Sequence, residues 1–327
     1  MQRTSGSIGL GALGTSAACS GRGGSAVRRE RRWRGNSAFP ERWGSSTAKR
    51  SFWMVDMSSY PYPTKAKQSF FKAFTIQCRV IGALIMRELH TRYGRDNIGY
   101  LWLIGEPLML GSVIAVLHSG GGGAGHGGAV SPAVFAMVGY TVFILFRSIV
   151  NRSEGAIDSN APLLYHRMVA VLDFTIARAT LELAGTVIAF VILFGFCLLT
   201  GLADPPPHPL ILLAGIGYVF WISFAVSMII TGGTYHRKLL ERFVHPFTYF
   251  QIPFSAAFFE VKSVPHPYRD YLLYSPLPHA FEIVRYGAFE GVTWDFVDLR
   301  YLNGVCLVLT FLGLVAMKSV KRRVHLL

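Results

Sequence analysis

Charged residues are scarce in this sequence, and acidic residues are the scarcest. The 327 residues include 18 Asp and Glu and 32 Lys and Arg, so that only 15% of the chain is charged while 51% is hydrophobic and the mean hydropathy is +0.38. A soluble domain typically carries about 25% charged residues. This deficit argues against a soluble protein and predicts an integral membrane protein.

Two further absences exclude kinds of chemistry. The chain has only four cysteines, Cys19, Cys78, Cys197 and Cys306, which lie too far apart to suggest a disulfide framework or a zinc site. No stretch combines a glycine-rich phosphate loop with a following Lys and Ser/Thr, and the glycine run at 120–128 lacks both. We therefore expect no metal and no cofactor in this chain, and any Mg-ATP chemistry in a partner.

The positive charge is concentrated at the N-terminus. Residues 1–53 hold ten Lys and Arg against two Asp and Glu, a large share of the net charge of +14. Their Arg-, Gly- and Ser-rich composition predicts disorder. A basic RNA-binding arm is the alternative, but we interpret 1–53 as a non-native extension with the true start at Met54 or Met57, and expect no nucleic-acid partner.

Six segments between residues 100 and 317 are long and apolar enough to be read as transmembrane helices, for which about 20 residues are needed. They are Tyr100 to Leu117, Ala133 to Val150, Phe174 to Thr200, Leu210 to Thr231, Val244 to Phe259 and Leu302 to Met317. The fifth contains Pro246 and Pro253, which predict a kinked or broken span. In the third, Arg178 and Glu182 are four residues apart and are expected to pair.

The distribution of basic residues predicts the orientation. Residues 54–100, 147–170, 232–245 and the tail from 318 hold 17 Lys and Arg, whereas the connections on the other side hold four. This asymmetry places a cytoplasmic segment at 54–99, a basic cytoplasmic tail at 318–327 and both termini in the cytoplasm.

An amphipathic helix is predicted just before the first span. In "SFFKAFTIQCRVIGALIMREL" the residues Phe70, Phe74 and Ile81 recur near the helical period, with basic residues on the other side. We expect this helix to lie in the cytoplasmic membrane interface. The alternative is an ordinary amphipathic helix packed on the protein.

Two motifs resemble a known family. "RELHTRYGRDNIGYLWLIGEPLM", at residues 87–109, resembles the start of the first span in ABC-2 type permeases that export capsular polysaccharide, O-antigen or teichoic acid, and the capsular branch looks most similar. "SPLPHAFEIVRYGAFEG", at 275–291, is similar to the pattern that precedes the last span in that family. The resemblance runs from about Phe70 to the C-terminus.

The resemblance implies an all-α, type V exporter-like fold and a transport subunit rather than an enzyme. It implies a homodimer in the bacterial inner membrane that pairs with a dimer of separate ABC ATPase subunits. The substrate would be a lipid-linked surface polysaccharide, moved outward, and periplasmic or outer-membrane export components would be further partners.

With the family in view, the predicted cytoplasmic loop 151–173 is the expected coupling segment to the ATPase. A short helix is predicted after Asn160 with proline at its first position. The residues expected to contact the ATPase are Asn160, Pro162, Leu163, Leu164, Tyr165, His166 and Arg167. The alternative is a plain interfacial connection. The basic patch Arg237, Lys238 and Arg242 either touches the partner or anchors the chain beside anionic lipid.

Two gate regions are also expected. One is at the start of the first span, where Pro107 would kink the helix and Glu106 would face a polar channel or a cation, or else lie hydrated near the interface. It comprises Arg92, Tyr93, Tyr100, Trp102, Glu106 and Pro107. The other is a periplasmic gate in which the helical spacing predicts a polar strip; it comprises Pro276, His279, Glu282 and Arg285.

Two other functional classes remain as alternatives. A membrane-embedded acyl- or glycosyltransferase would need carboxylates or histidines clustered at a span end, and only scattered ones are found. A gradient-driven transporter would show inverted repeats or several ionisable residues at mid-membrane, and no internal repeat is evident.

Overall fold

The computed structural model describes residues 70–93, 99–119, 131–161 and 169–324, all within the unit Lys67–Leu327. The basic extension 1–53, residues 54–69 and 94–98 of the predicted cytoplasmic segment 54–99, and the end of the tail lie outside these residues. Within the described ranges the chain forms helices, turns and bends, and no strand occurs. The all-helical prediction is therefore confirmed for this part of the chain.

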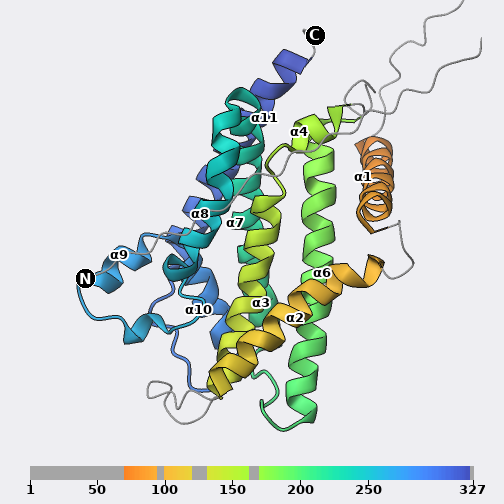
Figure 1. The fold of residues 1–327 in the computed structure, drawn as a ribbon. Coiled ribbons are helices and arrows are strands. Elements are labelled where there is room, and N and C mark those ends of the chain that lie inside the picture. The colour runs from red at the N-terminus through yellow and green to blue at the C-terminus, as the bar shows by residue number, and fades with distance from the viewer. Residues whose placement is uncertain (1–69, 94–98, 120–130, 162–168, 325–327) are drawn as a thin grey trace, which may run out of the picture. The chain divides into compact units, whose positions relative to one another are not determined.

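Long helices dominate the fold (Figure 1). They are α1 (Phe70–Tyr93), α2 (Gly99–Ser119), α3 (Pro132–Asn151), α6 (Val171–Leu199), α7 (Pro209–His236) and α11 (Leu299–Val324). Shorter elements connect them: α4 (Ala156–Ser159), η3 (Lys238–Leu240), α8 (Glu241–Phe254), η4 (Val261–Ser263), α9 (Tyr268–Leu273) and α10 (Pro276–Ala288).

Four of these helices are long and apolar enough to cross a membrane: α3, α6, α7 and α11 as far as Val320. They match the second, third, fourth and sixth predicted spans. The first predicted span is the helix α2, whose apolar part, Ile104–Leu117, is shorter. The fifth corresponds to α8, which ends at Phe254 rather than Phe259 and has 14 residues. At 1.5 Å per residue α8 is about 21 Å long, which is less than the roughly 30 Å of a bilayer core.

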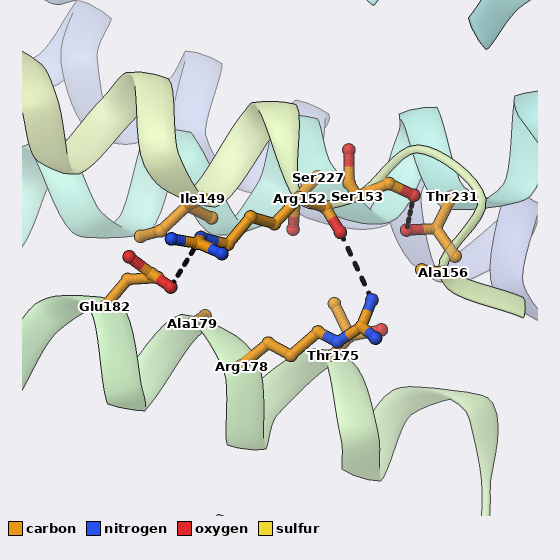
Figure 2. A pocket seen from close by; sticks show the side chains of 10 residues that line it. All are labelled: Ile149, Arg152, Ser153, Ala156, Thr175, Arg178, Ala179, Glu182, Ser227 and Thr231. Carbon is orange, nitrogen blue, oxygen red and sulfur yellow. Dashed lines mark hydrogen bonds and ion pairs between the residues drawn. The ribbon is translucent and has the colours of Figure 1, made fainter. Parts of the chain in front are cut away.

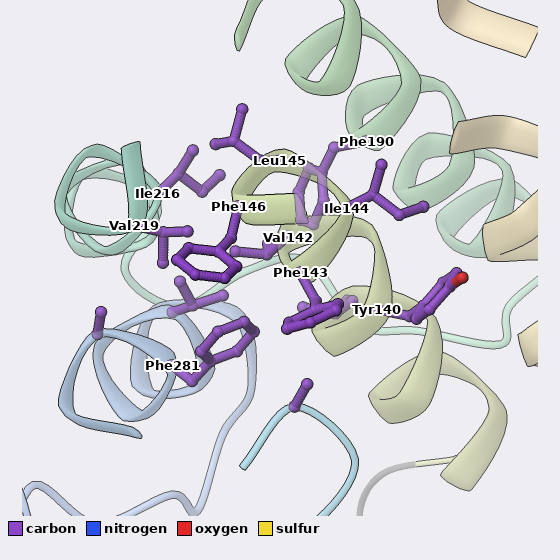
Figure 3. Close-up of a cluster of buried hydrophobic side chains, with 14 of the residues drawn as sticks. Tyr140, Val142, Phe143, Ile144, Leu145, Phe146, Phe190, Ile216, Val219 and Phe281 are labelled. Atoms are coloured by element: carbon purple, nitrogen blue, oxygen red, sulfur yellow. The ribbon is translucent and has the colours of Figure 1, made fainter. Parts of the chain in front are cut away.

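The helix α3 lies at the centre of the bundle. It packs against α2, α6, α7 and α8, and 83% of its most apolar stretch is buried, against 17% for α11. Its aromatic residues Phe143 and Phe146 meet Phe190 of α6 and Phe281 of α10 in one buried cluster (Figure 3). Because α3 is surrounded by protein, it forms the rigid centre against which the outer helices are placed.

Small residues allow the close contacts between helices. A side chain on Gly139 of α3 would place its Cβ 1.8 Å from the carbonyl oxygen of Ala257, and one on Gly287 of α10 would lie 2.3 Å from the backbone nitrogen of Leu212. Since lipid is as apolar as the side chains, membrane helices associate mainly through such close packing. These glycines fix α3 against the segment after α8, and α10 against α7.

The predicted amphipathic helix is present as α1. Its apolar residues Ile81 and Leu84 pack in a buried cluster with Ile157, which belongs to α4, and Phe174, which belongs to α6. Near its start, Phe71 is 79% exposed. The second half of α1 is thus packed on the protein, as in the alternative stated above, and the interfacial position of the helix stays a prediction.

Candidate functional site

Charged side chains from α1, α6 and the turn after α3 meet where α3 ends and α6 begins. Arg152, directly after α3, pairs with Glu182 of α6, with 2.7 Å between Nε and Oε1. Arg178, one turn earlier on α6, extends toward the same turn and donates from Nη1 to the Arg152 carbonyl oxygen at 3.3 Å (Figure 2). The turn after α3 is therefore bound to α6 by two arginines.

The helix α1 joins this group from the other side of α6. Arg178 Nε lies 2.9 Å from Glu88 Oε1 of α1, and Glu88 is buried. Arg87, the preceding residue on α1, donates a hydrogen bond to the side-chain oxygen of Asn160, which follows α4. We call Arg87, Glu88, Arg152, Asn160, Arg178 and Glu182 the junction network.

A second contact ties the other end of α1 to α6. Gln77 donates to Oδ1 of Asp173, whose Oδ2 accepts the backbone N–H of Ala170 at 2.9 Å. Asp173 thereby satisfies a free N–H at the start of α6, where a negative charge is also favoured by the helix dipole. Because Gln77 and Glu88 are eleven residues apart, α1 is held at two points about three turns from each other.

The junction network leaves almost no space for a ligand. The hollow between Ile149, Arg152, Thr175, Arg178 and Glu182 measures about 10 Å³. That is about the space needed for one water molecule. Thr231 of α7 closes the hollow by donating to the Ser153 carbonyl oxygen at 3.2 Å. The described contacts of the network can therefore hold elements together or transmit force, and this hollow has room for about one water molecule.

The predicted coupling segment begins at this network. Asn160, the first of its predicted residues, is buried, and its amide donates to the Ala156 carbonyl oxygen at 2.8 Å. The remaining predicted residues, Pro162 to Arg167, lie outside the described residues. The short helix that the structure describes here, α4, precedes Asn160, and the helix predicted from Pro162 onward lies outside the described residues.

The pairing expected between Arg178 and Glu182 is replaced by contacts to other elements. Arg178 binds Glu88 of α1 and Glu182 binds Arg152. The four-residue spacing puts both residues on one face of α6, but each pairs with an opposite charge from elsewhere in the chain, on α1 or in the turn after α3. Sequence spacing carries no signal for such partners, so Glu88 and Arg152 were missed.

The predicted gate at the start of the first span falls on α1 and α2. Arg92 and Tyr93 end α1, Tyr100 is the second residue of α2, and the side chains of all three lie outside what the structure describes. Trp102 is exposed, Glu106 is partly buried and Pro107 is buried inside α2, which continues past it. The structure does not bring Glu106 into an ion pair with any described residue.

The predicted polar strip on α10 is buried. Arg285 Nη1 lies 3.0 Å from Oε1 of Glu282, and Glu282 also accepts the backbone N–H of Val261 at 3.1 Å. Arg285 Nη2 donates to the carbonyl oxygen of Ala256, a residue with a positive φ of 55°. The pair therefore fixes the segment that returns from α8, and we call it the α10 ion pair.

His279 belongs to a different environment on the same helix. Its Nε2 lies 3.0 Å from the Leu273 carbonyl oxygen, and its Nδ1 accepts the backbone N–H of Asp298 at 3.3 Å. Pro276 is the first residue of α10 and takes part neither in the α10 ion pair nor in the hydrogen bonds of His279. His279 thus joins α10 to the connection before α11 and does not share a strip with Glu282 and Arg285.

An open pocket of about 350 Å³ adjoins His279. It is lined by Asp270, Leu273, Tyr274, His279, Asp295, Phe296, Val297, Asp298 and Tyr301. A hydrogen bond from the backbone N–H of Tyr301 lowers the pKa of Asp298 below its usual range. Among the described residues, no group of His, Cys, Asp and Glu is arranged to hold a metal ion.

Comparison with known proteins assigns the fold. The sequence profile described as "ABC-2 type transporter" matches residues 79–289, which is more than half of the chain. The chain belongs to the ABC-2 type transporter family. The match begins within α1 and ends directly after α10, so that the junction network and the α10 ion pair both lie inside the family domain.

The match between this ABC-2 protein and its curated relatives covers nearly the full length of those relatives. It is 33% identical over 259 residues, 79% of this chain and 97% of the relative, to capsule polysaccharide export inner-membrane protein CtrC of Neisseria meningitidis serogroup B. It is 32% identical over 257 residues to capsule polysaccharide export inner-membrane protein BexB of Haemophilus influenzae, with the same coverage of 79% and 97%. Polysialic acid transport protein KpsM of Escherichia coli is 32% identical over 250 residues, 74% of this chain and 93% of the relative. The prediction of an ABC-2 transport protein rather than an enzyme is confirmed.

Proposed function

We propose that this ABC-2 protein is the permease subunit of an exporter that moves a surface polysaccharide, carried on a lipid, outward across the bacterial inner membrane. The observation that carries the proposal is the similarity to relatives named for capsule polysaccharide export, which extends over 97% of their length. The four long apolar helices suit a membrane-embedded role. A membrane-bound transferase and a gradient-driven transporter are the rejected alternatives.

The proposed topology has six membrane passages and cytoplasmic termini. The helix α2 and the shorter α8, followed by a returning segment, would supply the two passages beyond the four long helices. The excess of Lys and Arg in 54–100, 147–170, 232–245 and the tail supports a cytoplasmic position for these segments. Under this topology the junction network lies at the cytoplasmic end of the bundle and the α10 ion pair toward the periplasm.

ATP hydrolysis is assigned to a separate dimer of ABC subunits, and the permease is proposed to act as a homodimer with a substrate path between the two copies. No cofactor is assigned to this chain, and Mg-ATP would bind in the partner. Further periplasmic and outer-membrane components would receive the polysaccharide. Glu106 with Pro107, and the region of Pro276 and His279, are proposed as the two gates.

The junction network supports a mechanism for coupling. The proposed coupling residues, Asn160 and Pro162 to Arg167, begin where α3, α4 and α6 meet. Asn160 is hydrogen-bonded to Arg87 of α1, whose neighbour Glu88 pairs with Arg178 of α6. A displacement of the coupling segment by the ATPase would therefore act on α1 and α6 together. We propose that this joint movement opens the path between the copies.

Co-purification tests the proposal. The permease, tagged and expressed with its native neighbours, is isolated from native membranes, and ATPase is measured in the purified sample. Residues 162–167 are replaced by Gly and Ser, and the matched control replaces residues 202–207, the same number, in the connection between α6 and α7. We expect a stoichiometric ATPase with the unchanged protein and the control, and its loss with the first variant.

The outcomes separate the two parts of the proposal. An absence of ATPase from the unchanged protein would overturn the exporter function and favour the transferase or gradient-driven alternatives. Retention of ATPase by the 162–167 variant, or its equal loss from both variants, would refute only the assignment of the coupling segment. Surface polysaccharide, measured in cells that lack the chromosomal copy, should follow the co-purified ATPase.

A further inference from the structure

An apolar groove runs between α7 and α8. It measures about 360 Å³, within the range of pockets that bind small ligands. Its walls are Val226, Ile229, Ile230, Gly233 and Thr234 from α7, and Leu240, Phe243, Val244 and Phe247 from the other side. Of these residues only Thr234 has a polar side chain, and its hydroxyl already donates to the Ile230 carbonyl oxygen at 2.9 Å. The groove therefore suits a hydrocarbon chain and offers no polar side chain of its own.

Basic residues gather at one end of the groove. The short connection from α7 to α8 carries Arg237 and Lys238, and Arg242 follows in the first turn of α8, adjacent in sequence to the groove residue Phe243; none of the three lines the groove itself. All three are exposed; Lys238 pairs with Asp158 at 3.3 Å, whereas Arg237 and Arg242 make no ion pair with any described residue. Glu241 is the one acidic residue of this connection. Two guanidinium groups are thus available for a phosphate, which they bind with paired hydrogen bonds.

The dimensions fit one leaflet of a membrane. From Val226 to Thr234 the groove follows eight residues of α7, or about 12 Å at 1.5 Å per residue. Half of a bilayer core of about 30 Å is about 15 Å. A groove that begins at a basic surface loop and extends about one leaflet deep matches an amphiphile with an anionic head and an apolar tail.

We propose that this groove binds an anionic phospholipid of the cytoplasmic leaflet, with one acyl chain between α7 and α8 and its phosphate at Arg237 and Arg242. The assignment to the cytoplasmic leaflet rests on the proposed topology; the binding itself does not. The basic residues lie at one end of the groove and not along it, so charge complementarity favours a phospholipid over a second copy of the chain. The apolar helices of a second copy would not need the two guanidinium groups. The lipid would fill the space between α7 and α8 and so hold α8 in place.

Lipid binding is measured on the purified full-length protein in neutral detergent, without ATPase or polysaccharide. Phosphatidylglycerol is added, and retained lipid is counted by native mass spectrometry, with phosphatidylcholine and glycerol phosphate as comparisons. Val226→Trp fills the groove, and Val308→Trp adds the same side chain at an exposed position of α11. Arg237→Gln with Arg242→Gln removes the charges, and Arg79→Gln, on α1, is the control for an exposed arginine.

We expect one tightly held phosphatidylglycerol per chain, its loss in V226W and its retention in V308W. The double Gln variant should bind about 30-fold more weakly, at roughly 1 kcal/mol for each basic residue beside anionic lipid, while R79Q should not change. Equal retention of phosphatidylcholine, or equal loss in V226W and V308W, would overturn the proposal. So would binding of glycerol phosphate as tight as that of the lipid. If V226W does not fold, the surface double variant decides.

One further outcome identifies another occupant. If V226W keeps the lipid but dissociates dimers, a second copy occupies the groove and the proposal is wrong. Because the measurement uses neither ATPase nor polysaccharide, it can fail while the exporter function holds, and it can succeed while that function fails.

Discussion

Replacing Arg285 by Met should destabilise the protein strongly. The Arg285 side chain is 1% exposed; it pairs with Glu282 at 3.0 Å, donates to the Ala256 carbonyl oxygen and lies 4.5 Å from the centroid of the Phe135 ring. Methionine fills part of the volume but leaves a carboxylate and a carbonyl oxygen buried without the guanidinium. Breaking a buried ion pair from one side costs about 3–5 kcal/mol.

Thermal unfolding in detergent measures this effect. At about 2–4 °C per kcal/mol, the apparent melting temperature of R285M should fall by roughly 6–20 °C. Lys262→Met, at an exposed position, is the control and should change it little. Replacing both charges, by Glu282→Leu with Arg285→Met, should recover most of the loss, because no unpaired charge is left buried. If R285M melts within about 2 °C of the unchanged protein, the α10 ion pair does not fix the segment after α8.

Two further changes test the packing and the junction network. Gly139→Ala places a Cβ 1.8 Å from the carbonyl oxygen of Ala257 and should lower the free energy of unfolding by about 1–3 kcal/mol. Gly105→Ala, whose Cβ would meet no atom within 4 Å, should not lower it. Thermal unfolding of both variants checks this. Glu88→Arg and Arg178→Glu should each lower polysaccharide export at unchanged protein level, and the double variant that exchanges the two charges should restore part of it. Surface polysaccharide is the readout. Failure of the exchange to restore export would argue against a role for this pair.

The long helices could be predicted because a bilayer constrains composition strongly. Every predicted span coincides with a helix, and the boundaries of α3 differ from the prediction by one residue at each end. The fifth was misjudged at its end: α8 stops at Phe254, and the chain turns through Ala256 with a positive φ. Apolar composition continues to residue 259, so hydropathy alone could not place this turn, which depends on a hydrogen bond from Arg285, 29 residues later.

In the candidate sites, too, local relations between residues could be predicted from the sequence and long-range contacts could not. The spacing of Glu282 and Arg285 on one helical face correctly predicted that they lie together, because that relation is local. Spacing could not predict that the pair is buried, or that His279 turns to the connection before α11. Glu88 offered no signal of its own, since an acidic residue on a predicted amphipathic helix ordinarily faces solvent.

The position of α3 relates the junction network and the α10 ion pair to each other. Phe135, near its start, lies under the Arg285 guanidinium, and Arg152, directly after its end, pairs with Glu182 in the junction network. The helix has 20 residues, or about 30 Å, and it is enclosed by other helices along most of that length. A closely packed helix moves as a unit rather than bending. Under the proposed mechanism, a displacement at the coupling segment can therefore pass directly through α3 to the segment held by α10. The helix α1 lies on the outside of α6 and provides no such route.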